Sequence, residues 1–173
     1  FKKAKKIKRK FGLLTFEPVP VMFFNKKIQS HRLDLEKQKI LNLKKEKLDF
    51  IIIQKFNKKF SNLSYQNFID KVLFKKIGCK YLYVSKNFKF GNKREGNVNK
   101  LKKYEKKFSY RTIITSPLTK EKKTISSTLI RKLLRRGNLR KVNYLLGRKW
   151  EIIGKVIRGS QRGRKLGFPT CNI

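Results

Sequence analysis

Residues 124–136 read Thr-Ile-Ser-Ser-Thr-Leu-Ile-Arg-Lys-Leu-Leu-Arg-Arg, a run of hydroxyl side chains followed by an amphipathic pattern. The pattern predicts a helix that Gly137 ends as its C-terminal cap. The apolar face of this helix consists of Leu129, Ile130, Leu133 and Leu134. Because that face must be buried, we expect the helix to pack against the rest of the protein and to leave its basic face in solvent.

The start of the predicted helix has the composition of a phosphate-binding site. Ser126, Ser127 and Thr128 stand ahead of the helical pattern, where hydroxyl oxygens accept N–H groups that lack an intrahelical partner. A helix N-terminus also carries a positive partial charge, and Arg131 lies close enough to add a bidentate phosphate contact. The same residues would also suit an ordinary capped helix with a basic outer face, so both interpretations stay open at this point.

The overall composition favours a globular protein with an affinity for anions. Among the 173 residues, 39% are hydrophobic and 12% aromatic, which is enough to form a core. The 48 Lys and Arg residues against 10 Asp and Glu give a net charge of +38. This excess is spread along the chain and is mostly Lys, accompanied by much Asn, Ile and Phe, all with A/T-rich codons. We therefore expect a general attraction for anions and no specific nucleic-acid partner.

Cysteine spacing and hydropathy indicate a cytoplasmic protein. Cys79 and Cys171 are far apart and fit neither a disulfide nor a metal-site pattern, which suits a reducing compartment. No apolar run has the length of a membrane span, and no signal peptide is visible. His31, the single histidine, lies in a predicted loop and receives no role. Because the chain opens on Phe1 and stops at Ile173 within a predicted strand, we expect it to be a fragment.

Strands and helices alternate along the sequence. Apolar runs predict strands at residues 13–16, 49–56, 81–84 and 111–115. Helical spacing predicts helices at residues 1–11 (ended by Gly12), 33–48 (with Asp34 as a possible N-cap), 64–77, 98–108 and 138–146 (ended by Gly147). This alternation predicts an α/β fold with a parallel sheet covered on both faces. The pattern becomes strand-like at Trp150, so we place a domain boundary near Arg148.

The segment after this boundary carries a family resemblance. Residues 154–173 contain Gly159, Gly163 and Gly167, with basic residues among them, and then Phe-Pro-Thr-Cys-Asn-Ile. This run closely resembles the opening of a riboflavin kinase barrel.

Motifs further upstream complete the resemblance. The sequence at 125–131, Gly-Asn at 137–138 and Leu-Leu-Gly-Arg at 145–148 resemble the end of an FMN adenylyltransferase domain. Thr-Phe-Glu-Pro at 15–18 and Asn-Phe-Lys-Phe-Gly at 87–91 extend the likeness towards the start of the chain. In this order and spacing, the motifs resemble the prokaryotic bifunctional riboflavin kinase/FAD synthetase family.

The resemblance implies two domains and two activities. Residues 1–148 would form a Rossmann-like FMN adenylyltransferase, which joins FMN to the AMP part of ATP and releases pyrophosphate. Residues 149–173 would begin a riboflavin kinase β-barrel, which phosphorylates riboflavin with ATP and Mg²⁺. The family's histidine-bearing nucleotidyltransferase motif has no counterpart here, and the kinase catalytic carboxylate would lie beyond Ile173. We therefore expect the chain by itself to have neither full activity.

The resemblance also assigns residues to the sites. The ATP phosphates would be bound by Ser126, Ser127, Thr128 and Arg131. Asn87 would contact the reacting phosphates, which makes Asn87 and Arg131 the catalytic candidates. The slot for the flavin ring would be formed by Pro18, Pro20, Phe88 and Phe90. In the kinase portion, ATP and Mg²⁺ would be bound by Gly159, Gly163, Gly167, Thr170 and Asn172, with Thr170 as the metal ligand.

Each assignment has an alternative that the residues alone leave open. Phe88 and Phe90 would also fit the inward face of a strand end, and Asn87 would fit a simple turn. The glycine- and arginine-rich run at 159–167 would also suit a basic loop that binds RNA. For the whole chain, the alternatives are a basic nucleic-acid-binding module or a nucleotidyltransferase with a different acceptor. The oligomeric state stays open, as does the role of Val19, which stands where the family commonly has His.

Overall fold

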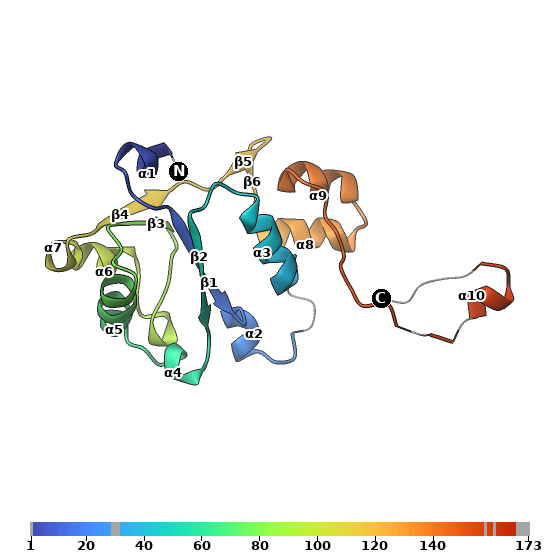
Figure 1. Cartoon of the computed structure of the whole chain (residues 1–173), viewed down its shortest axis with the longest axis horizontal. Helices are drawn as coiled ribbons and strands as arrows, with labels where there is room; N and C mark the ends of the chain where they lie inside the picture. Colours follow the sequence, from blue (N-terminus) through green and yellow to red (C-terminus); the bar gives the residue numbers. More distant parts are fainter. Residues whose placement is uncertain (1, 29–31, 158, 161, 169–173) are drawn as a thin grey trace. The chain divides into compact units, whose positions relative to one another are not determined.

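The computed structural model describes residues 2–28, 32–157, 159–160 and 162–168 (Figure 1). The chain divides into two compact units. The core unit consists of Leu13–Gln29 and Ile51–Ile125, and the helical unit of Phe1–Gly12, Ser30–Phe50 and Ser126–Ile173.

Four strands form two parallel pairs in the described residues. They are β1 (Gly12–Glu17), β2 (Phe50–Lys55), β3 (Tyr81–Ser85) and β4 (Arg111–Thr115). β1 pairs with β2, and β3 lies parallel to β4 with Val84 opposite Ile114. The N–H of Asp49 donates to Phe11 at one end of the first pair and that of Phe56 donates to Glu17 at the other, so these strands also run parallel. Each strand lies within one residue of its predicted ends.

The prediction of a single parallel sheet with both faces covered is confirmed only in part. No hydrogen-bonded ladder joins the two pairs among the described residues. They are held instead by packing on a common core, to which Phe16 of β1 and Val84 of β3 contribute. Side chains alternate along a strand, and on the opposite face of β3 Tyr81 and Tyr83 keep 37% and 42% of their surface exposed.

The remaining elements of the core unit are short. They are α2 (Pro20–Phe24), α4 (Lys58–Ser61), α5 (Tyr65–Asn67), the π-helix η1 (Phe68–Lys76), the 3₁₀ turn η2 (Asn92–Arg94), α6 (Val98–Lys103), α7 (Glu105–Phe108), β5 (Thr119–Lys120) and β6 (Lys123–Thr124). The helix predicted at 64–77 is confirmed as α5 continued by η1, and the Ser64 hydroxyl caps it by accepting the N–H of Asn67. The core closes around Ile69 and Leu101, which are both fully buried.

Polar contacts fasten α6 and α7 to β4 within this core. The Tyr110 hydroxyl donates to the carbonyl of Leu101 over 2.5 Å, and the N–H of Thr112 donates to the Glu105 carboxylate over 2.7 Å. Burial raises the pKa of Tyr110, and the negative charge of Glu105 raises it further. The phenol therefore stays protonated and keeps its donor role.

The helical unit contains α1 (Lys2–Lys6), α3 (Glu36–Lys44), α8 (Ser127–Arg135), α9 (Leu139–Leu146) and α10 (Arg162–Lys165). The two predicted helices at 124–136 and 138–146 are confirmed as α8 and α9, which pack against each other (Figure 1). Their buried apolar residues are Ile130, Val142 and Leu145. Between them, Gly137 has φ +68° and donates its N–H to Leu134, as expected for a residue that ends a helix.

Two helices predicted in this unit are shorter than expected. α1 ends at Lys6, because Lys8 adopts φ +50°, and Gly12 begins β1 instead of ending the helix. The helix predicted at 33–48 is reduced to α3, and Leu35 occupies the N-cap position. The prediction of Asp34 as the cap is wrong, since its carboxylate is engaged by a guanidinium group 114 residues away.

The strand predicted after Trp150 is not seen among the described residues, where Ile157 is an isolated β-bridge residue at the end of the run. Residues 149–156 contain no regular secondary structure, and Ile152 and Val156 are 68% and 62% exposed. An extended segment becomes a strand only when a neighbour pairs with it over several residues, and the described chain places no strand beside this one. The barrel opening, and the division at Arg148, therefore stay predictions.

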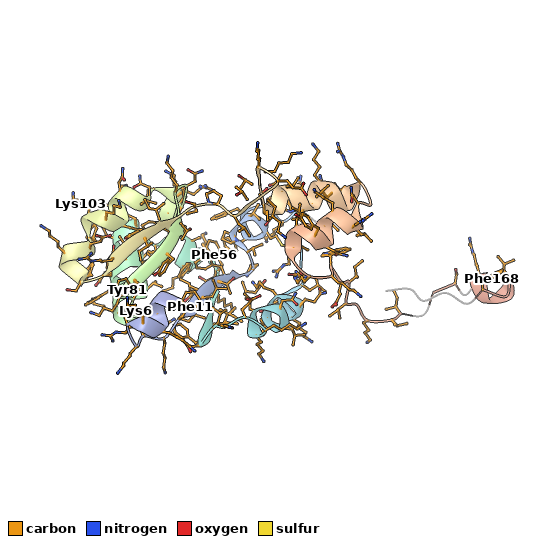
Figure 2. The ribbon with its side chains drawn as sticks, turned by 90° about the horizontal axis from the view of Figure 1, so that it is seen from above. Lys6, Phe11, Phe56, Tyr81, Lys103 and Phe168 are labelled. Atoms are coloured by element: carbon orange, nitrogen blue, oxygen red, sulfur yellow. The ribbon has the colours of Figure 1, made fainter. Side chains whose placement is uncertain are left out.

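Charge and hydropathy of the described residues agree with the sequence. Nitrogen-tipped side chains extend outward along the whole length of the ribbon instead of gathering on one element (Figure 2). In the part of the chain that the structure covers, no helix combines the length and the apolar character that crossing a membrane requires.

Candidate functional site

The loop after β1 presents prolines and aromatic rings. Pro18 follows the strand directly, and Pro20 is the first residue of α2, a position that suits its missing N–H and its fixed φ. Both prolines are half-buried. At the other end of α2, Phe24 is 69% exposed, although its ring contacts Phe23 at a centroid distance of 5.2 Å.

A continuous aromatic row connects this loop to the turn after β3. Its members, in order of contact, are Phe24, Phe56, Phe60, Phe68, Phe90 and Phe88. Successive ring centroids lie 5.8, 5.7, 6.2, 5.2 and 5.5 Å apart. The row brings together segments that follow β1, β2 and β3, and all of it belongs to the core unit. Sequence reasoning missed Phe24 and Phe56, although a Phe-Phe pair closing the Pro-x-Pro loop was a usable signal.

The turn after β3 carries Asn87 and the next two members of the row. The N–H of Phe88 donates to the carbonyl of Ser85 over 3.0 Å, and this turn leaves the Asn87 side chain exposed. Phe88 is half-buried and stacks on Phe90 with an interplanar angle of 20°. Phe90 is only 7% exposed and rests on Phe68, so its ring supports Phe88 from within the core.

Backbone hydrogen bonds close the loop that follows this turn. Phe90 and Gly96 exchange backbone hydrogen bonds, and the Glu95 carboxylate accepts the N–H of Tyr65 over 2.8 Å. Gly91 has φ +75°, and a Cβ added there would lie 2.9 Å from the Tyr65 nitrogen. Only glycine allows the backbone to approach α5 so closely, which explains its place after the Phe-Lys-Phe run.

The start of α8 offers hydroxyl groups and free N–H groups. Ser126 is the N-cap, and its Oγ accepts the N–H of Leu129 over 3.2 Å. The sequence predicts that Ser127 and Thr128 precede the helix, but in the structure they are its first two residues. Both are exposed. Arg131 follows Ser127 by one helical turn, so both lie on one face.

The predicted kinase residues are described only in part. Gly163 accepts the N–H groups of Leu166 and Phe168 over 3.1 and 2.8 Å, and Gly167 has φ +79°. These bonds form a compact turn at the end of α10. Gly159 is half-buried, whereas Thr170 and Asn172 lie outside the described residues. Among the residues that the structure describes, no cluster of three or more His, Cys, Asp or Glu side chains could hold a metal ion.

The candidate residues therefore fall into two groups. The prolines, Asn87 and the aromatic row belong to the core unit, while the start of α8 and the glycines belong to the helical unit. Each group is built on capped helices or on strand ends within its own unit.

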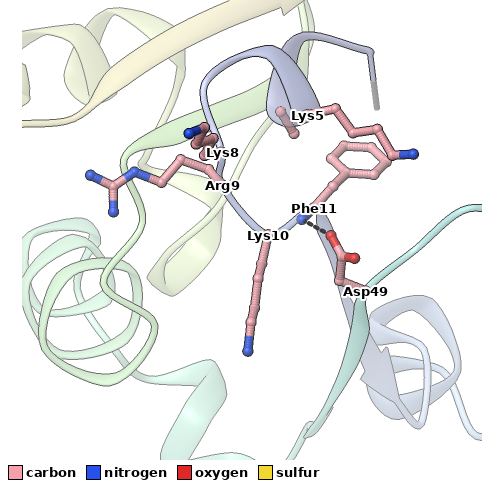
Figure 3. A pocket seen from close by; sticks show the side chains of 7 residues that line it. Lys5, Lys8, Arg9, Lys10, Phe11 and Asp49 are labelled. Carbon is pink, nitrogen blue, oxygen red and sulfur yellow. Dashed lines mark hydrogen bonds between the residues drawn. The ribbon is translucent and has the colours of Figure 1, made fainter.

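A cavity of about 300 Å³, lined by none of the candidate residues named above, lies in the helical unit beside α1 (Figure 3). Asp49 lines it and accepts the N–H of Phe11 over 2.6 Å. The lining side chains of Lys5, Arg9 and Lys10 point in different directions, so they do not converge on one anion (Figure 3).

Comparison with known proteins identifies the family. A family model described as FAD synthetase matches residues 1–129, and one described as riboflavin kinase matches residues 146–173. A bifunctional riboflavin kinase/FMN adenylyltransferase of Buchnera aphidicola (from Schizaphis graminum) is 42% identical over 97% of this chain and 55% of its own length. The proteins of the same description from Haemophilus influenzae and Escherichia coli K12 are 35% and 33% identical, over 99% and 93% of this chain. The chain spans about half the length of these relatives.

A solved structure shares the fold. A crystal structure described as a macrolide-efflux protein from Streptococcus pneumoniae matches with a TM-score of 0.80 and 28% identity, covering 99% of this chain and 55% of that one. Its description applies to that protein, and the likeness concerns the arrangement of the chain. Because the FAD synthetase model covers residues 1–129 of 173, the chain belongs to the FAD synthetase family.

Proposed function

We propose that this chain provides the adenylyl-transfer machinery of a bifunctional riboflavin kinase/FMN adenylyltransferase. The reaction joins FMN to the AMP part of ATP and yields FAD and pyrophosphate. The segment from residue 149 onward would belong to the half that phosphorylates riboflavin to FMN. Family membership and the names of the relatives support this proposal, and a cytoplasmic location would suit the reaction.

The chemistry requires positioning and charge stabilisation. An oxygen of the FMN phosphate attacks the α-phosphorus of ATP, and the bond from that phosphorus to the pyrophosphate oxygen breaks. Negative charge grows on the leaving pyrophosphate, and fixed donors that are in place beforehand stabilise it most effectively.

The start of α8 supplies donors of this kind. Helix geometry leaves the N–H groups of Ser127 and Thr128 without intrahelical acceptors, while Ser126 is engaged in capping. These N–H groups, the two exposed hydroxyls and the Arg131 guanidinium would hold the ATP phosphates. Asn87, exposed after β3, would contact the reacting phosphates with its amide.

The observation that carries the flavin part is the aromatic row. Phe24, at one end of the row, is 69% exposed, and Phe88, at the other end, is half-buried beside the exposed Asn87. A flat tricyclic ring binds well against accessible aromatic side chains of this kind. Pro18 and Pro20 would form another wall of the slot. Phe90, being buried, would act by supporting Phe88.

In the kinase half, the oxygen donor assigned to Mg²⁺ has the chemistry that this hard cation prefers. The hydroxyl of Thr170 would hold the ion beside the phosphates of ATP, where it neutralises their charge, and Asn172 would contact the bound nucleotide. Gly159, Gly163 and Gly167 would let the backbone approach the nucleotide.

Flavin fluorescence tests the proposed function against the nucleic-acid alternative. FMN titrated with the chain should lose fluorescence as its ring stacks on the aromatic side chains. A random oligonucleotide should bind weakly and only at low salt. Tight oligonucleotide binding together with unchanged FMN fluorescence would favour the basic nucleic-acid-binding module.

Phe24→Ala should weaken FMN binding without a loss of folding stability. Aromatic contacts contribute about 0.5–1.5 kcal/mol beyond their buried area, so we expect the dissociation constant to rise by roughly tenfold. Leu118→Ala is the matched control, because Leu118 is also 69% exposed in the core unit and lies outside the aromatic row. Fluorescence titration of both variants measures the effect, and equal affinities would remove Phe24 from the flavin slot.

A further inference from the structure

Residues 148–151, at the domain boundary that the sequence predicts near Arg148, are hydrogen-bonded to α3 and to the segment before it. The Arg148 guanidinium donates to both carboxylate oxygens of Asp34, over 2.7 and 2.6 Å. The side chains are 30% and 17% exposed, so water screens this pair less than it screens a surface pair.

Trp150 adds two hydrogen bonds to the contacts of Arg148. Its indole N–H donates to the carbonyl of Leu33 over 2.8 Å, and its backbone N–H donates to the side-chain oxygen of Asn143 on α9 over 2.8 Å. The residue is therefore tied both to the loop before α3 and to α9. All of these residues lie in the helical unit.

Gln38 completes the arrangement from inside α3. It is 6% exposed, so its polar amide is buried. Its Nε2 donates to the carbonyl of Glu151 over 2.9 Å, while its Oε1 accepts the N–H of Leu35 over 3.1 Å. A buried amide is stable only when both of its ends are hydrogen-bonded, so the position of Glu151 is specified by α3.

A flexible linker would show the opposite properties, namely solvated polar residues with few contacts. The side chains of Lys149 and Glu151 are exposed, but the carbonyl of Glu151 still accepts the hydrogen bond from Gln38. The following Ile152 and Ile153, by contrast, keep 68% and 50% of their surface in solvent. The fastened stretch thus ends between Glu151 and Ile152.

We propose that residues 148–151 form a rigid joint that holds the start of the riboflavin kinase region on α3 and α9. The boundary between the two modules then falls after Glu151 and not near Arg148. The place at which the chain leaves the helical unit then depends on Asp34 and Gln38. The proposed joint positions the chain, and the contacts that support it do not depend on the binding of flavin or nucleotide.

The chain's single tryptophan, Trp150, reports on this joint directly. Asp34→Asn keeps the shape of the side chain and removes the charge, so Arg148 loses its strongest contacts. We expect the emission of Trp150 to shift to longer wavelength and its quenching by acrylamide to increase. Trypsin should cut after Arg148 or Lys149 about tenfold faster, since cleavage follows the population of the open state.

Glu46→Gln is the matched control, because it removes one carboxylate from an exposed position of the same unit. Far-ultraviolet circular dichroism shows whether each variant is folded. Gln38→Glu offers a second test at neutral pH, since it replaces the donor to Glu151 by an acceptor and should produce the same changes. If Asp34→Asn and Gln38→Glu are folded and match Glu46→Gln in emission, quenching and cleavage rate, the joint does not exist.

Discussion

Replacing Arg131 by alanine is expected to slow FAD formation by a factor of about 10²–10³ in the bifunctional protein, while riboflavin phosphorylation stays nearly unchanged. The guanidinium would lie beside the phosphates at the start of α8, where negative charge grows as pyrophosphate departs. Losing such a donor raises the barrier of this step alone. The two half-reactions are measured separately, with FMN or riboflavin as substrate.

Lys132→Ala is the control for this experiment. Lys132 is the neighbouring residue on the same helix and is exposed, and its substitution also removes one positive charge. If α8 is merely a capped helix with a basic face, Arg131→Ala will lower the stability slightly and leave both rates at their original values. In that case the assignment of Ser126, Ser127 and Thr128 to the ATP phosphates is wrong as well.

Gly91→Ala should lower the free energy of unfolding by about 3 kcal/mol, through strain and steric conflict acting together. The backbone at Gly91 has φ +75° and ψ 175°, a conformation that residues with a Cβ rarely adopt. The added Cβ would also lie 2.9 Å from the backbone nitrogen of Tyr65. That nitrogen cannot move away without lengthening its hydrogen bond to Glu95.

Gly78→Ala separates the two causes. Gly78 has φ +65°, but no atom lies within 4 Å of the position of its Cβ, so only the conformational term applies and the loss should be about 1 kcal/mol. Urea denaturation of the two variants measures the difference. Equal losses would mean that the contact with α5 does not constrain this turn.

Much of the fold follows from local sequence signals. The apolar run at residues 111–115 becomes β4 with the same ends, and the glycines after α8 and α9 have the positive φ that ends a helix. Ser126 and Asn138 both cap the helices that follow them. These features depend on the preferences of a few neighbouring residues, and such preferences can be inferred from the sequence alone.

The features that sequence reasoning missed depend on residues far apart in the chain. Asp34 has the chemistry of an N-cap, yet its partner is Arg148, whose Nη2 donates to both oxygens of the carboxylate, because two charge-assisted hydrogen bonds are stronger than a single cap bond. The run after Trp150 has strand-like residues, but a strand also requires a pairing neighbour.

The candidate site shows the same division between local and distant signals. The structure contains the turn after β3 and the capped start of α8 that the motifs indicated, while their roles in binding flavin and phosphate stay predictions. The motifs did not reveal that Phe24 and Phe88 are joined through rings that come from other segments. Such a series of ring contacts forms only when distant segments fold together, so the sequence motifs do not indicate it.

The unequal burial in the two units would affect how the protein responds to a nucleotide bound at the proposed site. α8 and α9 rest on the small cluster of Ile130, Val142 and Leu145, whereas the core unit closes around Ile69, Leu101 and many aromatic rings. Elements with few buried contacts open locally while the rest of a protein stays folded, and their amide hydrogens then exchange with solvent. A ligand that binds only the closed form suppresses such opening in proportion to its concentration. ATP bound at α8 would thus act as a folding ligand for the helical unit, and its apparent affinity would include the free energy of ordering those two helices.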